Sequence, residues 1–354
     1  MSVDESAAYR GLAAPSEPID VVRLASWLEA NIEGFAGPLK VEQFKGGQSN
    51  PTYKLTAGSG SYVLRRKPSG ALLPSAHAVD REFRVLRAVA GTGVPVPEVL
   101  ALCEDAAVIG TMFYVMRFVA GRVFWDQRLP ELTRGERAEI FDSLNATIAA
   151  LHRIDPTAVG LTDFGRPGNY MQRQVARWSK QYRAAETTPI DAMDRLIDWL
   201  PAHLPPESKT RIVHGDFRLD NVIVHPTQPR VIAVLDWELS TLGDPLGDFA
   251  YHMMSWRLEP ELFRGLARVD FGALGIPNEN AYLAAYRRRT GEDPGTHWEF
   301  YMVYSLFRVA AILQGIGKRA LDGTAASPSA AALGSKAAPI AARAWSMAQA
   351  TMRG

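Results

Sequence analysis

Three polar side chains lie next to short apolar segments in the middle of the chain. Asp216 comes after residues 211–213, and Asn221 lies five positions later. Asp236 ends the apolar run 231–235, fifteen positions beyond Asn221. Phosphoryl transfer from ATP needs a carboxylate to orient the accepting hydroxyl, and an amide and a second carboxylate to hold Mg²⁺ on the phosphates. The three residues offer this set in order, although each of them alone is typical of a turn or a helix cap.

We predict a different role for Asp216 and for each of the polar residues near it in the sequence. Asp216 itself would accept or orient the proton of the acceptor hydroxyl. Arg218 would reach the same phosphate and stabilise its charge in the transition state, or else lie in solvent. We expect His214 to be structural, because its side chain should point from the strand into the core. Asp248 opens a predicted helix, and it either caps that helix or braces the backbone of the catalytic loop.

The spacing Asp-x-x-x-x-Asn followed by a metal-binding Asp is also that of the protein kinases. A second match to kinases is misleading, because Asp163-Phe-Gly165 spells their metal tripeptide. It lies about fifty residues before Asp216, whereas the metal carboxylate must follow the catalytic loop. We therefore assign the metal role to Asp236 and none to Asp163.

A glycine-containing segment in the N-terminal part offers contacts to phosphates. It lies between two predicted strands, where a hairpin would let backbone N–H groups approach a nucleotide closely. The full G-x-G-x-x-G pattern is absent. The segment comprises Gly46, Gly47, Gln48, Ser49 and Asn50.

A cation is expected at the end of the third strand, where it would hold the α- and β-phosphates. Arg65, Arg66 and Lys67 all stand there, and the sequence leaves the choice among them open. Glu82 lies beside the apolar stripe of the next predicted helix and should face inward, where it needs a partner. We pair it with Arg65, the alternative being a surface ion pair.

The elements that must position these residues fall into two parts. Residues 38–119 show strands, one helix at 76–90 and further strands, which indicates a small α+β lobe. From about residue 131 the pattern is mainly helical, and 322–338 has the Ala, Ser and Gly content of a loop. We predict one domain at 1–119, an N-terminal helix and nucleotide-binding lobe, and a second at 120–354 with the catalytic loop, metal site and acceptor site.

Composition excludes several classes of protein. The 354 residues are 47% hydrophobic and 22% charged, as in globular domains. A net charge of +1 argues against a nucleic-acid partner. With one cysteine, Cys103, no intrachain disulfide can form. No secretory signal is evident and no apolar run approaches the ~20 residues of a membrane span. We expect a cytoplasmic protein without a membrane partner.

Six segments together make the chain resemble the aminoglycoside phosphotransferase family of kinase-like enzymes. Within it, the chain is most similar to kinase-like domains related to those fused to acyl-CoA dehydrogenases. The segments are 46–53, 62–68, 73–82, 164–170, 214–221 and 235–238.

The resemblance implies a protein-kinase-like two-lobed fold, with a small β-rich N-lobe and a larger helical C-lobe. It also implies ATP in the cleft, Mg²⁺ on Asn221 and Asp236, Asp216 as the base, and adenine held by the backbone near Arg117 and Val119. The sequence departs from the family at Arg65, where many members have Lys; Arg keeps the charge but changes the geometry. Residues 217–220 also replace the commoner His-Pro segment, which argues for a different acceptor.

Charge bears on the acceptor, a small molecule with a hydroxyl group. Aminoglycosides are polycations, yet residues 256–300 hold seven acidic and six basic residues, which is no acidic pocket. The stretch Tyr286–Arg289 and the pair Arg173 and Arg177 could receive an anion, although solvated helix faces explain both more simply. The resemblance points to a 4-hydroxyacyl compound or its CoA thioester. The alternatives are an aminoglycoside-type antibiotic kinase and a non-catalytic nucleotide-binding module.

Overall fold

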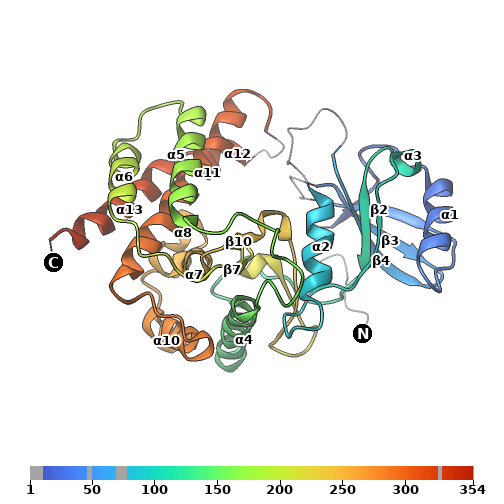
Figure 1. The fold of residues 1–354 in the computed structure, drawn as a ribbon, viewed down its shortest axis with the longest axis horizontal. Coiled ribbons are helices and arrows are strands. Elements are labelled where there is room, and N and C mark those ends of the chain that lie inside the picture. The colour runs from blue at the N-terminus through green and yellow to red at the C-terminus, as the bar shows by residue number, and fades with distance from the viewer. Residues whose placement is uncertain (1–10, 46–49, 69–77, 326–328, 354) are drawn as a thin grey trace. The chain divides into compact units, whose positions relative to one another are not determined.

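The computed structural model describes residues 11–45, 50–68, 78–325 and 329–353 (Figure 1). They pack as two compact units. The sheet unit comprises the chain up to Phe124, Thr157–Leu161 and Leu219–Ser240. The helical unit comprises Trp125–Pro156, Thr162–Arg218 and the chain from Thr241. The predicted division at residue 119 into nucleotide-binding and acceptor-binding parts remains a prediction about function.

The sheet unit is built on a six-stranded antiparallel sheet in the order β1-β2-β3-β4-β6-β5. Its strands are β1 (Leu12–Ala13), β2 (Lys40–Phe44), β3 (Thr52–Ala57), β4 (Gly60–Arg66), β5 (Val99–Cys103) and β6 (Phe113–Arg117). Successive side chains of a strand point to opposite faces. In β4 this alternation puts Tyr62 and Leu64 on one face, and Val63 and Arg65 on the other.

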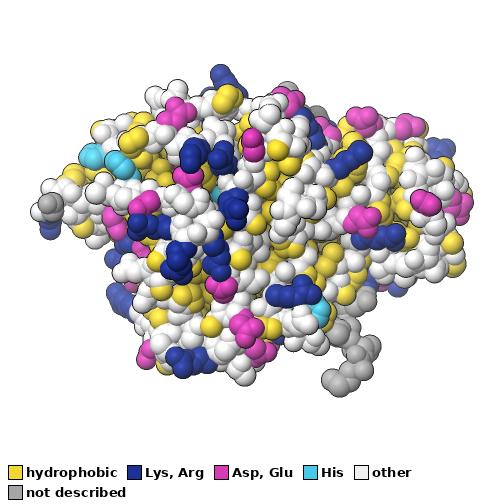
Figure 2. All heavy atoms as spheres, turned by 60° about the horizontal axis from the view of Figure 1, so that its bottom comes forward, with side chains coloured by type: hydrophobic (Ala, Val, Ile, Leu, Met, Phe, Trp, Pro, Cys, Tyr) yellow, Lys and Arg dark blue, Asp and Glu magenta, His cyan; other side chains and the backbone are white. Residues whose placement is uncertain are grey.

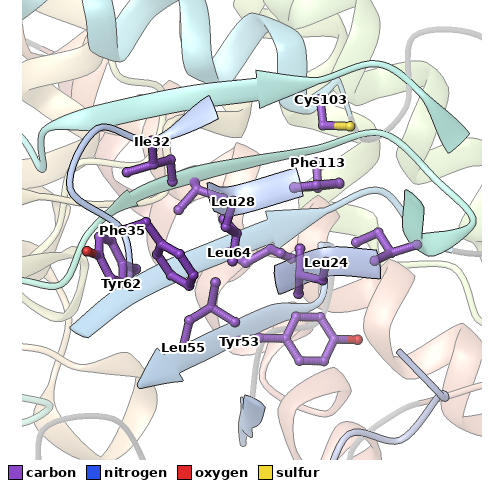
Figure 3. Close-up of a cluster of buried hydrophobic side chains, with 12 residues drawn as sticks. Leu24, Leu28, Ile32, Phe35, Tyr53, Leu55, Tyr62, Leu64, Cys103 and Phe113 are labelled. Carbon is purple, nitrogen blue, oxygen red and sulfur yellow. The ribbon is translucent and has the colours of Figure 1, made fainter. Parts of the chain in front are cut away.

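Helices cover both faces of this sheet. Figure 1 shows α1 (Val21–Asn31) and α2 (Val79–Val89) on opposite sides of it. Leu24 and Leu28 of α1 join Tyr62, Leu64 and other residues in the buried cluster of Figure 3, which the short α3 (Ala106–Ile109) closes. The α1 face is therefore apolar, and the α2 face is the one that receives Arg65.

The sheet unit also takes in a hairpin from the middle of the chain. Its strands are β8 (Val222–Val224) and β9 (Val231–Val234), which pair antiparallel between the 3₁₀ turns η2 (Leu219–Asn221) and η3 (Trp237–Leu239). The turn η3 packs against α2. This hairpin brings the predicted metal residues into the same unit as Arg65 and Glu82.

The helical unit surrounds one long central helix, α11, which contacts α5, α7, α12 and α13. Its other elements include a small two-stranded sheet of β7 and β10. The bounds are α4 (Arg134–Arg153), α5 (Tyr170–Ala185), α6 (Asp191–Ala202), β7 (Arg211–Val213), β10 (Thr241–Gly243), α7 (Pro245–Met253), η4 (Met254–Arg257), α8 (Pro260–Phe263), α9 (Phe271–Leu274), α10 (Glu279–Thr290), η5 (Gly295–His297), α11 (Trp298–Leu321), α12 (Ala330–Gly334) and α13 (Ala337–Thr351). The predicted α+β class, with a β-rich lobe followed by a helical lobe, is confirmed.

The central helix is also apolar enough to cross a membrane. Among the described residues, Gly295–Leu321 is the one segment that meets this criterion by length and composition, with a mean hydropathy of 1.3. However, 78% of the window is buried inside the protein. A core helix of a folded domain has the same two properties, since it is apolar all round and covered by neighbours.

The predicted loop at 322–338 is wrong in part, because α12 and the start of α13 lie within it. Alanine has the highest helix propensity of all residues, so the alanine-rich run folds as helix once it has a surface to pack on. That surface is α11. A Cβ on Gly334 would lie 2.4 Å from the Cα of Gly317, so both glycines are needed for this close approach.

Candidate active site

The predicted metal residues lie at one end of the β8–β9 hairpin. Val222 pairs with Val234, and the carbonyl of Asn221 accepts a hydrogen bond from Leu235 N–H at 2.8 Å. Asp236 follows directly. The fold thus brings Asn221 and Asp236 together as two hard oxygen donors of the kind that Mg²⁺ prefers. No group of three or more His, Cys, Asp or Glu side chains is gathered for a metal in the described parts of the chain.

The backbone of Asp236 is in an uncommon conformation. Its φ of 64° and ψ of 60° lie in the left-handed region, which a non-glycine residue adopts at a cost. Asp236 does occupy the N-cap position of η3, as the alternative explanation expected, but its side chain makes no capping hydrogen bond. Strained residues of this kind cluster at functional sites. The conformation is therefore compatible with the predicted functional role of Asp236.

Arg65 holds three carboxylates on the α2 face of the sheet. Its Nε lies 2.8 Å from Glu82 Oε2, which confirms the predicted pairing. Its Nη2 lies 2.7 Å from Asp236 Oδ1 and 3.4 Å from Glu238 Oε2. Burial by itself would lower the pKa of Arg65, but Glu82 and Asp236 raise it above its ordinary value. The guanidinium is thus fixed as a cation at the hairpin end.

The two competing cations point elsewhere. Arg66 is on the α1 face, where it pairs with Glu17 and lies over the Tyr53 ring. Lys67 lies 3.8 Å from Asp80. Of the three predicted candidates, Arg65 is the one that reaches the Asp236 carboxylate.

Glu82 is almost completely buried and has three polar neighbours. Asn50 Nδ2 donates to it at 2.7 Å and the Tyr114 hydroxyl at 3.1 Å, in addition to the Arg65 ion pair. Burial raises the pKa of the Glu82 carboxyl, against the opposing effects of these three neighbours. Asn50 is therefore bound to Glu82. Its predicted contact with a phosphate remains a prediction. Gly46, Gly47, Gln48 and Ser49 lie outside the described residues.

Asp216 lies in the helical unit, three residues after the end of β7. Its carboxylate is 3.1 Å from Nη2 of Arg218, so Arg218 is engaged with the predicted base. The hydroxyl of the buried Tyr251 forms a hydrogen bond with the Asp216 side chain. Burial, followed by the charge of Asp216, raises the pKa of Tyr251 to about 12, so this hydroxyl keeps its proton and donates it to the carboxylate.

Asp248 braces the loop that carries Asp216. Its two carboxylate oxygens accept from His214 N–H at 2.7 Å and from Gly215 N–H at 2.8 Å. The N-cap of α7 is instead Asp244, which accepts from Leu246 N–H at 2.8 Å. Of the two roles expected for Asp248, bracing is confirmed and capping is wrong. The reason is sequence distance, since Asp248 lies four residues inside the helix.

The Asp248 carboxylate is buried and needs compensation. His152 Nε2 lies 3.1 Å from it, while the other ring nitrogen meets the Tyr286 hydroxyl at 2.6 Å. Burial would raise the pKa of Asp248, but His152 and the His214 backbone lower it below its ordinary value. The Asp248 carboxylate that holds the loop of Asp216 is therefore an anion in a fixed position. His214 itself is fully buried, as predicted, and its Nδ1 accepts from Asp216 N–H at 3.2 Å.

The tripeptide Asp163-Phe164-Gly165 has a structural explanation. Phe164 is fully buried, and a Cβ on Gly165 would lie 2.4 Å from Thr241 Oγ1. The tripeptide thus anchors a turn against β10, with Asp163 exposed. The absence of a metal role for Asp163 remains a prediction.

The predicted adenine segment follows β6. Arg117 ends that strand, with its N–H bonded to the carbonyl of Glu98 at 2.8 Å, and Val119 lies in the connection that leaves the sheet. Their contact with adenine remains a prediction.

The basic stretches considered for an anionic acceptor are largely engaged within the protein. Arg289 binds both oxygens of Asp142, at 2.7 and 2.8 Å, and Arg287 pairs with Asp293. Arg173 donates to the carbonyl of Arg166 at 2.6 Å. These partners favour the structural explanation of both stretches.

Three residues of the site escaped the sequence interpretation: Tyr114, Tyr251 and Arg308. Glu238 belongs to the matching segment 235–238, but no role was predicted for it. Arg308 was detectable as a lone charge within the apolar run Tyr304–Leu313 of a core helix. Tyr114 and Tyr251 lie in ordinary apolar segments and give no local signal.

The two units define the class of the protein. A sheet lobe carrying a buried Arg–Glu pair, and a helical lobe carrying a braced Asp loop, are the parts of a kinase-like fold. The chain belongs to the phosphotransferase enzyme family, whose pattern matches residues 40–296. The predicted resemblance is thereby confirmed.

Two curated relatives are longer than this chain. The mouse acyl-CoA dehydrogenase family member 10 is 50% identical over 314 residues, which are 88% of this chain and 29% of that protein. The rat acyl-CoA dehydrogenase family member 11 is 44% identical over 324 residues, which are 88% of this chain and 41% of that protein. The chain therefore spans less than half the length of either relative.

Solved structures give the same fold. A Ralstonia eutropha protein, provisionally assigned as an aminoglycoside phosphotransferase, is 54% identical with a TM-score of 0.87, and the match covers 94% of this chain and 99% of that one. A thermostable aminoglycoside phosphotransferase variant in complex with ADP and hygromycin B is 17% identical with a TM-score of 0.58, covering 92% of this chain and 97% of that one. The second likeness concerns the fold alone.

Proposed function

We propose that this phosphotransferase uses ATP and Mg²⁺ to phosphorylate the hydroxyl group of a small acyl compound. The observation that carries the proposal is the arrangement of Arg65 with Asp236, beside Asn221. It offers one cation for phosphates and hard oxygen donors for a metal at the end of a single hairpin. The same segment of chain begins with Asp216 on its braced loop.

The reaction assigns a task to each side chain. The acceptor oxygen forms a bond to the γ-phosphorus, the bond from that phosphorus to the β-phosphate oxygen breaks, and ADP leaves. Asp216 takes the proton of the acceptor hydroxyl, and Arg218 balances charge beside it. Arg65, held by Glu82, binds the α- and β-phosphates. Asn221 and Asp236 would hold Mg²⁺, which neutralises charge on the transferred phosphate.

The acceptor class rests on charge and on the relatives. Figure 2 shows acidic and basic side chains mixed over the visible face of the helical unit, without the large acidic field that a polycation would need. The names of the curated relatives refer to acyl-CoA dehydrogenases. A 4-hydroxyacyl compound or its CoA thioester fits both, and its phosphorylation would turn the hydroxyl into a leaving group. The name of the 54% identical bacterial protein supports an aminoglycoside as the second candidate.

One panel separates these candidates from a non-catalytic role. ADP release is measured with 4-hydroxyacyl-CoA, the free 4-hydroxy acid, kanamycin and hygromycin B, each with and without Mg²⁺. We expect Mg²⁺-dependent turnover with a hydroxyacyl acceptor and none with the antibiotics. Turnover with the antibiotics alone would restore the antibiotic kinase. ATP binding without turnover on any acceptor or water would support the non-catalytic module.

A further inference from the structure

A second buried arginine contacts the catalytic loop from the core helix α11. Arg308 is 5% exposed, and its Nη2 donates to the carbonyl oxygen of Gly215 at 2.5 Å. The guanidinium carbon lies 4.1 Å from the centre of the Tyr251 ring and 5.2 Å from that of Trp178. No carboxylate of the described residues forms an ion pair with it, and its Nε has no hydrogen-bond partner.

This arrangement is costly for a residue that only fills space. Burying a guanidinium without a paired carboxylate removes its hydration, and a methionine or leucine would pack the same helix face at lower cost. Burial by itself would lower the pKa of Arg308, but its neighbours Tyr251, Tyr304 and Tyr170, and then Asp216, raise it above its ordinary value. We therefore expect the Arg308 cation to have a role that depends on the groups it contacts.

Its contacts converge on the Gly215–Asp216 peptide. Gly215 has a φ of +83°, and its N–H is held by Asp248 while its C=O is held by Arg308. The ring on which Arg308 lies belongs to Tyr251, whose hydroxyl binds the Asp216 carboxylate. One arginine thus fixes both the backbone that precedes Asp216 and the tyrosine that orients its side chain.

We propose that Arg308 is a positioning residue that sets the orientation of the Asp216 carboxylate for proton transfer. The proposal rests on the proposed role of Asp216 as the base. A misplaced base lowers the rate of chemistry and leaves nucleotide binding unchanged, because the described contacts of Arg308 are with Gly215, Tyr251 and Trp178, none of which is assigned to the nucleotide. A structural role alone would reduce the amount of folded protein and leave the activity of each folded molecule intact.

The test is a double-mutant cycle of Arg308→Met and Asp216→Asn. The probe is MgATP with water as the acceptor, followed by ADP release, so it does not depend on knowing the acceptor. Arg308→Met should lower kcat by about 10–100-fold, the usual effect of a displaced catalytic group, with the ATP KM within about twofold. In the Asp216→Asn background the same change should cost less than about twofold, because both act through one group. Arg308→Lys, which keeps a charged donor, should recover part of kcat.

Hydrogen exchange of residues 211–218 supplies an arm that needs no activity. Arg308→Met should speed exchange there by about tenfold while other parts of the helical unit stay unchanged. The matched control is Arg183→Met, which removes an exposed arginine lying over the ring of Tyr182 at 5.6 Å. That control should change neither kcat nor exchange in the loop. If Arg308→Met does not fold, Arg308→Gln replaces it, since glutamine keeps a donor and lacks the charge.

Three results would overturn the proposal: losses that multiply fully in the cycle, a rise in ATP KM without a fall in kcat, or unchanged exchange at 211–218. One further result would instead contradict the proposed function, in which Asp216 is the base. If Asp216→Asn turns over ATP like the wild type, Asp216 is not the base, and the exchange arm still decides whether Arg308 holds the loop.

Discussion

Arg65 in the sheet unit and Arg308 in the helical unit are both buried arginines next to catalytic candidates, yet their surroundings are opposite. Arg65 lies within ion-pair distance of three carboxylates, those of Glu82, Asp236 and Glu238. Arg308 is surrounded by aromatic rings and a backbone carbonyl. The first site has more anionic groups than cationic ones, and the second has a cation without an ion-paired carboxylate among the described residues.

The difference separates two tasks of a phosphotransferase. A surplus of carboxylates attracts a divalent cation, and the single arginine among them can hold phosphates. A cation without an ion-paired carboxylate acts on anions in its surroundings, and Asp216 is the carboxylate among the groups that raise the pKa of Arg308. In the proposed reaction, the sheet unit would therefore hold the nucleotide and its metal, and the helical unit would handle the proton. Variants at either site should separate metal dependence from proton transfer.

The largest effect is expected from Asp236→Ala. Loss of an anionic metal ligand should remove several kcal/mol of charge stabilisation, which lowers Mg²⁺-dependent ATP turnover by roughly 10³-fold or more. Asp163→Ala is the matched control and should leave metal dependence within about twofold of the wild type. Activity measured over a Mg²⁺ titration checks both. The reverse pattern would show that the Asp-Phe-Gly tripeptide holds the metal.

Asp216→Asn should lower kcat by roughly 10²–10⁴, the usual contribution of general-base catalysis. Asparagine keeps the size of the side chain and loses the proton acceptor, so ATP should bind as before. Steady-state kinetics combined with calorimetric ATP binding distinguish the two steps. Wild-type turnover in this variant would show that Asp216 is not the base, and that the helical unit does not provide the proton acceptor.

Arg65 and Glu82 should act as one unit in nucleotide binding. Arg65→Met and Glu82→Gln should each weaken ATP binding, and the double variant should be weaker by less than the sum. We expect a coupling free energy of about 1–3 kcal/mol, as for contacting charged residues. Calorimetric binding of ATP to the four proteins of the cycle gives the value. A coupling of zero would transfer the phosphate role to Arg66 or Lys67.

The sequence predicted the contacts of this site that join neighbouring elements of the chain. Alternation in β4 put Arg65 opposite Leu64, and the apolar stripe of α2 turned Glu82 toward it, so the pair followed from two neighbouring elements. Asn221 and Asp236 could also be predicted to lie close together, because they flank the two strands of one hairpin.

What the sequence could not supply was long-range contact. Arg308 bonds to a carbonyl 93 positions away, and no periodic pattern carries such information. For Asp248 the two roles stayed open, because choosing between them required the exact start of α7. Helix boundaries depend on capping contacts that sequence locates only within a few residues.

The smallest expected effect is on the pH dependence of stability. The sign of this dependence differs between a buried group of the helical unit and one of the sheet unit. His252, buried in α7, bonds to the Tyr282 hydroxyl at 2.8 Å. Burial lowers its pKa to about 4, from 6.5. Between these values the unfolded chain binds a proton that the folded chain does not, so stability falls as the pH falls. By contrast, burial raises the pKa of Glu82 in the sheet unit, and that shift acts in the opposite direction.

The stability contribution of His252 should be complete above pH 6.5 and should decline by about 2 kcal/mol at pH 5. Asp248 adds little in this range, because the pKa of its carboxyl is lowered and its own loss comes at more acidic pH. Urea unfolding followed between pH 7 and 5 gives the slope. His252→Gln should flatten that slope, whereas His203→Gln, at an exposed position, should leave it unchanged. An unaltered slope in His252→Gln would mean that another group carries the acid sensitivity of the helical unit.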